Sequence, residues 1–351
     1  MIFEKISTIL TADELLNKAY SRSARAGRGK IREEYTDKRE LEETMVLTAG
    51  NILTDNLHNS VKDWPSLERM GRFYVELVDI LVGIEKLKMS LGSVSWAADK
   101  CKEISRKYVG ILRKDPDPVK VRRQAFGRMA SIIYDIDSDL RFLNDARNIL
   151  RKLPDVKDEP TIVVAGYPNV GKSSFVATVT GAHPEIAHYP FTTKGIIIGH
   201  FSANKTRYQV IDTPGLLDRP LEERNDIEQQ AISALRHIAD TLLFILDPSE
   251  TCGYTIEEQI MLLGEVKEFI DMPMLVVANK IDVQKPKDVE FDMSMSTLTG
   301  ENVEAVKNRL IEMIQEAGVI KHKSAEPGED VEFQQLPPSR KQKKESEPRA
   351  P

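Results

Sequence analysis

Apolar side chains recur at about every third or fourth position in the first part of the chain, the spacing of one buried face of an α-helix. The pattern runs from Thr11 to about Pro154 and is broken by polar segments such as "RKDPDP". Its clearest stretch contains Phe73, Leu77, Ile80, Leu81, Ile84 and Leu87. Because such helices bury their apolar faces against one another, we predict an antiparallel bundle of about four or five helices.

Local signals mark where several of these helices begin. Thr11 followed by Glu14 has the spacing of a capping box. Asp117-Pro118 is typical of a helix restarting after the "RKDPDP" break, and Pro65 suits the first turn of another helix.

The hydrophobic pattern changes after "LPDVKDEP", residues 153–160. Short continuous apolar runs replace the helical spacing, with helical or loop segments between them. These runs begin at Thr161, Gly195, Arg207, Thr241, Pro273 and Val289. Runs of this kind are typical of strands covered on both faces. We therefore predict a helical domain over residues 1–158 and an α/β domain with a mostly parallel sheet over residues 159–320.

Residues 321–351 differ from both parts. The segment is rich in proline and charge and poor in large apolar residues. It cannot bury enough surface to offset the entropy lost on ordering, so we predict a disordered tail.

Composition adds limits on class and location. The chain is 41% hydrophobic and 30% charged with a formal net charge of -6, which fits a soluble globular protein. Cys101 and Cys252 lie far apart and lack metal-ligand spacing, which suggests a reducing compartment. No apolar run approaches the ~20 residues of a membrane span, and the amino terminus lacks a signal sequence. We expect a cytoplasmic protein, monomeric when free, that binds no membrane.

The first apolar run leads into "GYPNVGKSSF", a phosphate-binding loop with strand before it and helix after it. Its glycines, Gly166 and Gly171, let backbone amides turn toward phosphates. Lys172 would supply positive charge to the outer phosphates, and Ser173 would offer a hydroxyl to Mg²⁺. The predicted nucleotide contacts from this loop are Gly166, Tyr167, Pro168, Asn169, Val170, Gly171, Lys172, Ser173 and Ser174.

A second motif favours guanine as the base. In "ANKID", the Asp282 carboxylate can accept hydrogen bonds from both N1–H and the exocyclic amine of guanine, whereas adenine would oppose it with an acceptor. The stem of Lys280 can cover the face of the base. Residues of this motif and of the following "MSTLTGEN" segment would close the pocket: Asn279, Lys280, Ile281, Asp282, Ser296, Thr297 and Leu298.

Two segments between these motifs have the character of nucleotide switches. Thr193 in "YPFTTKG" is our choice to contact Mg²⁺ and the terminal phosphate, and Asp212 in "DTPG" our choice for the outer metal shell. The Gly215 amide can bind the γ-phosphate, so loss of that phosphate would release both segments. The switch residues are Phe191, Thr192, Thr193, Asp212, Thr213, Pro214 and Gly215, and the catalytic candidates are Lys172, Thr193 and Gly215.

These motifs, in this order, resemble the Obg-related branch of the translation-factor class of GTPases. "LDPSETCGYTIEEQ" and the preceding helical region look more narrowly like the nucleolar GTP-binding protein (Nog) family. Because the chain ends soon after the α/β domain, we expect the short archaeal type. The resemblance implies a GTPase that acts in assembly of the large ribosomal subunit.

Leu216 follows Gly215, where many GTPases carry a glutamine that orients the attacking water. The resemblance implies that an apolar residue here is compatible with hydrolysis, so we expect slow turnover with the water oriented by other groups. Asn169 resembles an asparagine that holds K⁺ in some relatives, where the ion adds positive charge. Equally, Asn169 fits a tight loop for conformational reasons alone.

Basic residues cluster in two places in the helical region. Such runs belong either to solvated helix faces or to RNA-binding surfaces, and the Nog resemblance favours ribosomal RNA. The candidate contacts are Arg22, Arg25, Arg28, Lys30, Arg32, Arg122 and Arg123. We therefore expect a slow, Mg²⁺-dependent GTPase that binds ribosomal RNA or precursors of the large subunit. The alternatives are a GTP-gated module that binds a protein, and an RNA-modifying GTPase, for which the helical region offers no second catalytic group of residues.

Overall fold

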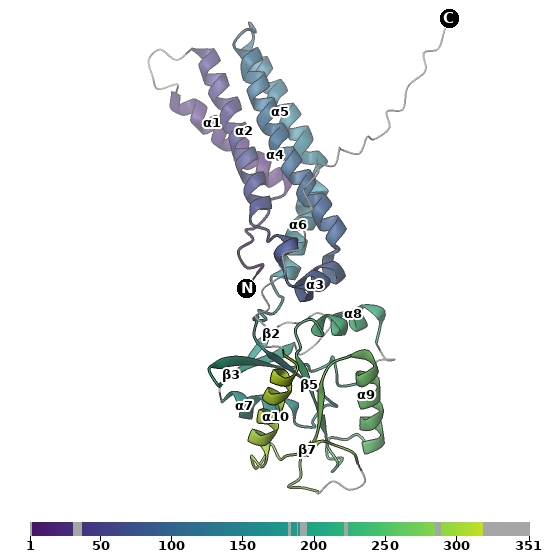
Figure 1. The fold of residues 1–351 in the computed structure, drawn as a ribbon. Coiled ribbons are helices and arrows are strands. Elements are labelled where there is room, and N and C mark those ends of the chain that lie inside the picture. The colour runs from purple at the N-terminus through teal and green to yellow at the C-terminus, as the bar shows by residue number, and fades with distance from the viewer. Residues whose placement is uncertain are drawn as a thin grey trace, which may run out of the picture.

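The computed structural model describes residues 2–30, 37–181, 184–187, 189, 195–220, 224–284 and 289–318. An elongated helical domain contacts the α/β domain at one of its ends (Figure 1). The predicted tail and four predicted site residues lie outside the described residues, and so does the side chain of Lys30. The four site residues are Arg32, Phe191, Thr192 and Thr193. The disordered tail therefore stays a prediction. The domain boundary between residues 158 and 159 also stays a prediction.

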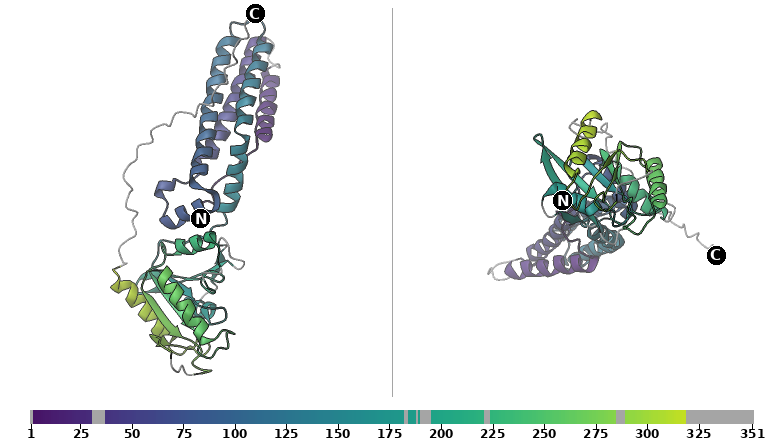
Figure 2. Two further views of the ribbon diagram at one scale, coloured as in Figure 1. Left: turned by 90° about the vertical axis from the view of Figure 1, so that its right-hand side faces the viewer. Right: turned by 90° about the horizontal axis from the view of Figure 1, so that it is seen from below.

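Long helices form the bundle, and a shorter one, α3, lies at the end nearest the sheet (Figure 2). The described helices of this domain are α1 (Ala12–Lys30), α2 (Lys38–Lys62), η1 (Leu67–Arg69), α3 (Arg72–Val82), α4 (Ile84–Leu112), α5 (Pro118–Asp135) and α6 (Asp137–Leu150). The described part thus has six α-helices, more than the four or five predicted. Gly83, with φ of 78°, divides the apolar series from Phe73 to Leu87 into α3 and α4.

Two of the three sequence signals for the beginning of a helix are confirmed. The Thr11 amide donates to the Glu14 carboxylate at 2.9 Å and the Glu14 amide donates back to the threonine hydroxyl at 3.4 Å, which confirms the capping box. Asp117 caps α5 by accepting from the Lys120 amide at 3.1 Å. The prediction for Pro65 was wrong, because it precedes only the single 3₁₀ turn η1.

Close approach of α2 and α4 forms the centre of the bundle. A Cβ atom on Gly50 would lie 2.4 Å from the Ser105 Cβ, so only glycine fits there without a shift. Leu53 and Val94 are fully buried in the same core. The bundle is therefore held mainly by apolar burial, as the helical spacing predicted.

The α/β domain contains a seven-stranded sheet in the described residues, with order β2-β3-β4-β1-β5-β6-β7. Strands β4, β1, β5, β6 and β7 are parallel to one another, and β3 pairs antiparallel with β2 and β4. The bounds are β1 (Thr161–Ala165), β2 (Glu185–Ala187), β3 (Ile196–Ala203), β4 (Thr206–Asp212), β5 (Thr241–Leu246), β6 (Met274–Ala278) and β7 (Met293–Ser294). This confirms the mostly parallel α/β sheet.

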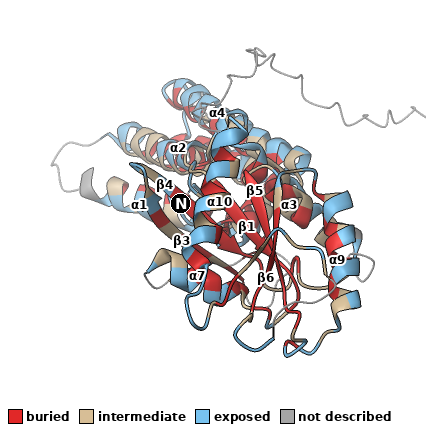
Figure 3. Ribbon diagram, turned by 60° about the horizontal axis from the view of Figure 1, so that its bottom comes forward, coloured by how far each residue is buried: buried red, intermediate tan, exposed pale blue. Residues whose placement is uncertain are grey.

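Where the structure describes this domain, four helices accompany the strands: α7 (Lys172–Thr180), α8 (Asp226–Leu235), α9 (Ile256–Phe269) and α10 (Val303–Glu316). Helices α7 and α10 contact each other, and the central strands are buried among the helices (Figure 3). Every residue of β1 and β5 is buried, as expected for strands covered on both faces. Strand β2 was not predicted, because two of its three residues are exposed and the run is too short to show a pattern.

The two domains meet where α3 packs against α8. Glu76 of α3 lies 2.6 Å from His237 Nε2, just beyond α8. The Tyr74 hydroxyl donates to the Pro154 carbonyl at 2.9 Å and accepts from the Val156 amide at 2.9 Å, which ties the connecting segment to α3. The junction is therefore packed and hydrogen-bonded.

Candidate guanine-nucleotide site

The phosphate loop joins β1 to α7, and close contacts explain the glycine at each end. Gly166 has φ of 128°, and a Cβ there would lie 2.5 Å from the Ile245 carbonyl oxygen of β5. Gly171 has φ of 111°, and a Cβ there would lie 2.1 Å from Asn279 Nδ2. Both positions therefore need glycine for conformation and for space.

Lys172, the first residue of α7, is buried within this loop. Its ammonium donates to the carbonyl oxygens of Gly166 and Tyr167, both at 2.8 Å. An anion at the amino terminus of α7 would meet both this charge and the helix dipole. The loop thus presents the positive charge that the motif predicted.

Ser173 and Asp212, two of the predicted Mg²⁺ contacts, lie side by side. The Ser173 hydroxyl donates to Asp212 Oδ2 at 2.5 Å, while Asp212 Oδ1 is buried without a hydrogen-bond partner. Burial raises the pKa of Asp212, although the Ser173 hydrogen bond opposes that change. A buried carboxylate oxygen beside a hydroxyl fits Mg²⁺, which takes few protein ligands and completes its shell with water and phosphate. Ser173 and Asp212 would hold the ion, which would neutralise phosphate charge.

Asn279 connects the base-recognition motif with the phosphate loop. Its Nδ2 donates to the Val170 carbonyl at 2.8 Å and to the Thr297 hydroxyl at 3.1 Å. Its Oδ1 accepts from the Thr297 amide at 3.0 Å. Three segments far apart in the sequence are therefore fixed relative to one another by one side chain.

Asp282, the predicted guanine ligand, is oriented by Ser296, whose hydroxyl donates to Asp282 Oδ1 at 2.5 Å. The Ser296 oxygen also accepts from the Thr299 amide at 3.1 Å. A cavity of about 270 Å³ lies beside these groups. Its lining residues are Asn169, Gly171, Ser174, Asn279, Lys280, Asp282, Val283, Thr297 and Leu298. Residues of the phosphate loop, of the base-recognition motif and of the "MSTLTGEN" segment therefore share one cavity.

The remaining predicted contacts of the phosphate loop and the base motif adjoin the lining residues in the sequence. The Ile281 amide donates to the Met295 carbonyl at 3.4 Å, and the Tyr167 ring stacks on Tyr254. Asn169 is exposed with φ of 63°, the conformation of a tight loop. Pro168 is half-buried in the same loop.

The "DTPG" segment has a defined conformation between β4 and α8. The Gly215 amide donates to Asp218 Oδ2 at 2.7 Å, and the Gly215 carbonyl accepts from Arg224 Nη1 at 2.9 Å. Leu216 is fully buried. The Leu217 carbonyl accepts from the Gly166 amide at 3.0 Å, while the Thr213 hydroxyl donates to the Val164 carbonyl at 3.1 Å, so this segment is joined to β1 and the phosphate loop.

Sequence reasoning missed several groups near this site. Asp218 and Arg224 belong to the charged segment "DRPLEER", whose position directly after "DTPG" was the available signal. Asp247, Thr251 and Tyr254 belong to a segment used only for its family resemblance. Their contacts with the predicted site depend on how β5 and β6 align, which no local pattern reveals.

The candidate RNA contacts that the structure describes divide into two kinds. Arg22, Arg25 and Arg28 are exposed on α1, and Arg123 is exposed on α5. Arg122 instead forms an ion pair with buried Glu42 and lies over the Phe126 ring. Arg122 therefore has a structural partner, whereas the exposed arginines present their charge to solvent.

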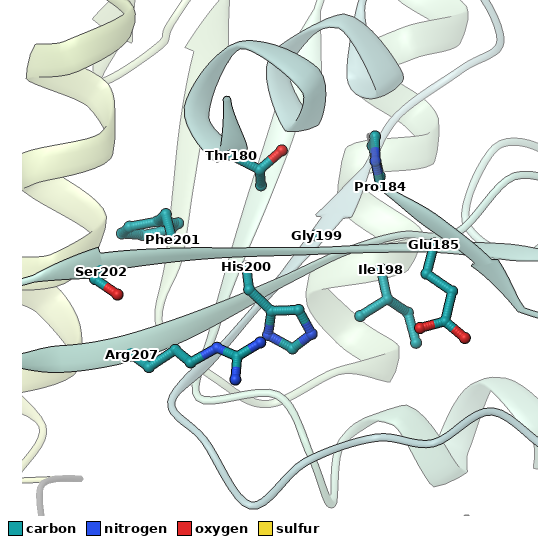
Figure 4. A pocket seen from close by; sticks show the side chains of 9 residues that line it. All are labelled: Thr180, Pro184, Glu185, Ile198, Gly199, His200, Phe201, Ser202 and Arg207. Carbon is teal, nitrogen blue, oxygen red and sulfur yellow. The ribbon is translucent and has the colours of Figure 1, made fainter. Parts of the chain in front are cut away.

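A separate cavity of about 390 Å³ lies beside the β2–β3 hairpin, lined by residues that include Thr180, His200 and Arg207 (Figure 4). His200 Nδ1 lies 2.9 Å from a Glu159 carboxylate oxygen. No predicted nucleotide contact lines this cavity. In the described part of the chain, no helix is both long and apolar enough to span a bilayer.

The fold and the site define a P-loop protein of the guanine-nucleotide-binding class. Residues 3–157 match the family model described as the NOG1 N-terminal helical domain, and residues 226–282 match that of nucleolar GTP-binding protein 1. An uncharacterized protein of Methanocaldococcus jannaschii is 44% identical over 80% of this chain and 81% of its own length. The chain belongs to the nucleolar GTP-binding protein 1 family.

Eukaryotic relatives are longer than this chain. The probable nucleolar GTP-binding protein 1 of Dictyostelium discoideum is 35% identical over 83% of this chain but only 44% of that protein. The chain thus spans about half the length, or less, of such relatives. A crystal structure of the putative nucleolar GTP-binding protein 1 of Plasmodium falciparum is 38% identical, with a TM-score of 0.43, over 48% of this chain and 92% of that chain.

Proposed function

We propose that this protein is a slow, Mg²⁺-dependent GTPase whose nucleotide state controls its binding to ribosomal RNA or to precursors of the large ribosomal subunit. The observation that carries the switch is the hydrogen bond between the Gly215 amide and Asp218. We place the protein in the cytoplasm as a free monomer. Its ligands are GTP or GDP with Mg²⁺, and K⁺ at Asn169 stays a further prediction.

The Gly215 amide is the donor that the γ-phosphate of GTP would use. In the structure the Asp218 carboxylate accepts from it at 2.7 Å. A bound γ-phosphate would compete for this amide and repel the carboxylate, because both carry negative charge. Loss of the phosphate would restore the internal hydrogen bond, so the segment has two alternative partners.

Leu216 offers no polar atom to orient a water molecule, and its side chain is buried in the core. The groups left to act on the phosphates are Lys172, the predicted Thr193 and backbone amides such as that of Gly215, while Ser173 and Asp212 would hold the metal ion. Charge stabilisation without a positioned water-orienting group supports hydrolysis at a low basal rate.

The same segments reach the helical domain. Arg224, which holds the Gly215 carbonyl, lies just before α8, and α8 packs against α3. Tyr189, the first residue of the other predicted switch segment "YPFTTKG", is fully buried, stacks on Phe73 of α3 and donates to the Ala231 carbonyl of α8 at 2.7 Å. A change at either switch would therefore act on the contact between the domains.

The exposed arginines of the bundle would supply the RNA contact. Helices α1 and α5 are joined by Tyr20 stacked on Phe126 at 4.4 Å, and they carry Arg22, Arg25 and Arg123 on their exposed surfaces. Arginine pairs well with phosphate oxygens, and several such contacts make binding salt-dependent. The names of the eukaryotic relatives include the word nucleolar, which supports a role in ribosome assembly.

A second candidate function is GTP-gated binding of a protein factor. The observation that favours it is the exposure of large apolar side chains on α4, where Met89 is 72% exposed and Trp96 is 44% exposed. Met89 and Trp96 are two helical turns apart and therefore lie on one face, and apolar side chains gathered on one exposed face are typical of protein interaction surfaces.

Co-sedimentation with large-subunit particles, with GDP or a non-hydrolysable GTP analogue, tests the proposal. We expect binding to depend on nucleotide, to fall with salt, and to be lost when Arg22, Arg25 and Arg28 are changed to glutamate. A matched control changes the exposed residues Lys62, Arg69 and Lys88 to glutamate and should bind normally. Binding unaffected by salt, RNase and the arginine changes would favour the protein-binding alternative.

A further inference from the structure

The loop after β5, residues 247–254, surrounds the lysine of the base-recognition motif. Asp247 is fully buried, and its Oδ2 accepts from Lys280 Nζ at 2.7 Å, the Cys252 amide at 2.8 Å and the Thr251 hydroxyl at 3.1 Å. Its Oδ1 accepts from the Ser249 amide at 3.0 Å. A buried carboxylate with these donors is a fixed anchor for the lysine.

Lys280 is placed by this anchor. Its ammonium also donates to the Thr251 hydroxyl at 2.9 Å, while the residue lines the base cavity together with Asp282. The backbone at Lys280 is left-handed, with φ of 63°. With the ammonium held by the loop, the methylene stem is available to contact a flat base by dispersion and burial.

Hydrogen bonds from α9 hold the conformation of the loop. Gln259 accepts from the Asp247 amide at 2.7 Å and donates to the carbonyl oxygens of Asp247 at 3.1 Å and Tyr254 at 3.0 Å. Thr255 begins α9 with a capping box. One buried amide side chain thus holds both ends of the loop.

The other end of this loop contacts the phosphate loop. The Tyr254 ring stacks on the Tyr167 ring with centroids 4.1 Å apart, and the Tyr167 carbonyl accepts from Lys172. The segment therefore contacts the base side through Lys280 and the phosphate side through Tyr167.

We infer that Asp247 is a positioning residue for guanine-nucleotide binding: it holds Lys280 so that the lysine stem packs on the base. The inference rests on nucleotide binding at this site and is independent of hydrolysis or RNA binding. It assigns the 247–254 segment to the nucleotide site. Without the carboxylate, the Lys280 ammonium loses its buried partner and its stem samples other rotamers.

A double-mutant cycle on fluorescent GDP affinity tests this assignment. Asp247→Asn keeps the side-chain shape and should weaken GDP binding by about tenfold, because the lysine is no longer held. Lys280→Met should weaken binding by a similar factor. In the Lys280→Met background, Asp247→Asn should have almost no further effect, since its action passes through the lysine.

The melting temperature of each variant without nucleotide shows how far the substitution changes the stability of the fold, separately from its effect on GDP affinity. A purely structural role would lower GDP affinity by the same factor in both backgrounds, and that additive result would overturn the inference. Unchanged affinity in Asp247→Asn would overturn it as well.

Thr251→Val provides a milder variant that keeps the carboxylate if Asp247→Asn does not fold. We expect a smaller loss of affinity, again absent in the Lys280→Met background, and a loss that persists there would contradict the inference. Glu268→Gln, which changes an exposed carboxylate on α9 outside this loop, is the matched control and should bind GDP normally. A failure of the unmodified protein to prefer GDP over ADP would refute guanine binding itself, which distinguishes the two failures.

Discussion

The base side and the phosphate side of the candidate site differ in how their polar groups are satisfied. On the base side, Asn279 and Asp282 are held by hydrogen bonds that join neighbouring segments and leave a cavity beside them. On the phosphate side, Lys172 and Gly215 bond to nearby groups of the chain in places where a nucleotide would bind.

The difference indicates distinct roles. Base contacts that are already oriented give selectivity with little cost of ordering on binding. Phosphate contacts that must exchange partners make the local conformation depend on which nucleotide is bound. We therefore expect guanine selectivity to be the same in both nucleotide states, and the phosphate side to respond to the γ-phosphate.

The largest effect should come from the phosphate side. Lys172→Ala removes the charge that meets the outer phosphates and should lower GTP hydrolysis by at least about a hundredfold. Phosphate release measures the rate, and circular dichroism should show a folded helical bundle. Lys267→Ala, an exposed lysine on α9, is the control and should hydrolyse GTP normally. Turnover that survived in Lys172→Ala would place the active phosphate site elsewhere.

On the base side, Asp282→Asn should lower GTP affinity by about 2 kcal/mol, because one acceptor facing the guanine edge becomes a donor. Binding of xanthine nucleotides should improve for the same reason. Competition titrations with GTP, XTP and ATP measure both changes. Equal affinity of the unmodified protein for ATP and GTP would refute the role given to Asp282.

Leu216 separates the effect of packing from that of polar chemistry, because it lies in the phosphate-side segment but has an apolar side chain. Leu216→Ala should lower the free energy of unfolding by about 2–4 kcal/mol through the cavity it leaves. Hydrolysis by the folded protein should fall much less than in Lys172→Ala. Urea unfolding and phosphate release measure the two effects. A catalytic loss equal to that of Lys172→Ala would mean that packing of this segment limits the reaction.

The smallest effect concerns pH. Burial pushes the pKa of Asp247 upward, but hydrogen bonds from Lys280 and Ser249 outweigh it and leave that pKa lowered. The stabilisation that the ionised Asp247 carboxylate gives to the fold is complete above the ordinary pKa of aspartate. It is lost as the pH falls through the lowered pKa. Between about pH 5 and pH 3, the melting temperature should therefore fall less steeply in Asp247→Asn, by on the order of 2 °C. Parallel curves for the two proteins would contradict this effect.

Sequence periodicity and motifs predicted the class of both domains and the residues of the phosphate and base motifs. They predicted strands at Thr161 and Thr241 because those runs are continuously apolar, and every residue of both strands is buried in the structure. They did not separate α3 from α4, since the apolar spacing continues across Gly83. Long-range contacts such as Lys280 with Asp247 and α3 with α8 depend on tertiary packing, which a one-dimensional pattern does not contain.

Hydrogen–deuterium exchange tests whether the phosphate side responds to the γ-phosphate while the base side does not. The protein would be compared with GDP and with a non-hydrolysable GTP analogue, both with Mg²⁺. We predict that peptides covering residues 212–220 and α8 differ between the two nucleotides, while those covering residues 274–284 and 293–298 are protected equally in both. Equal protection of the 212–220 peptide in both states, or a difference confined to the base-side peptides, would contradict the account.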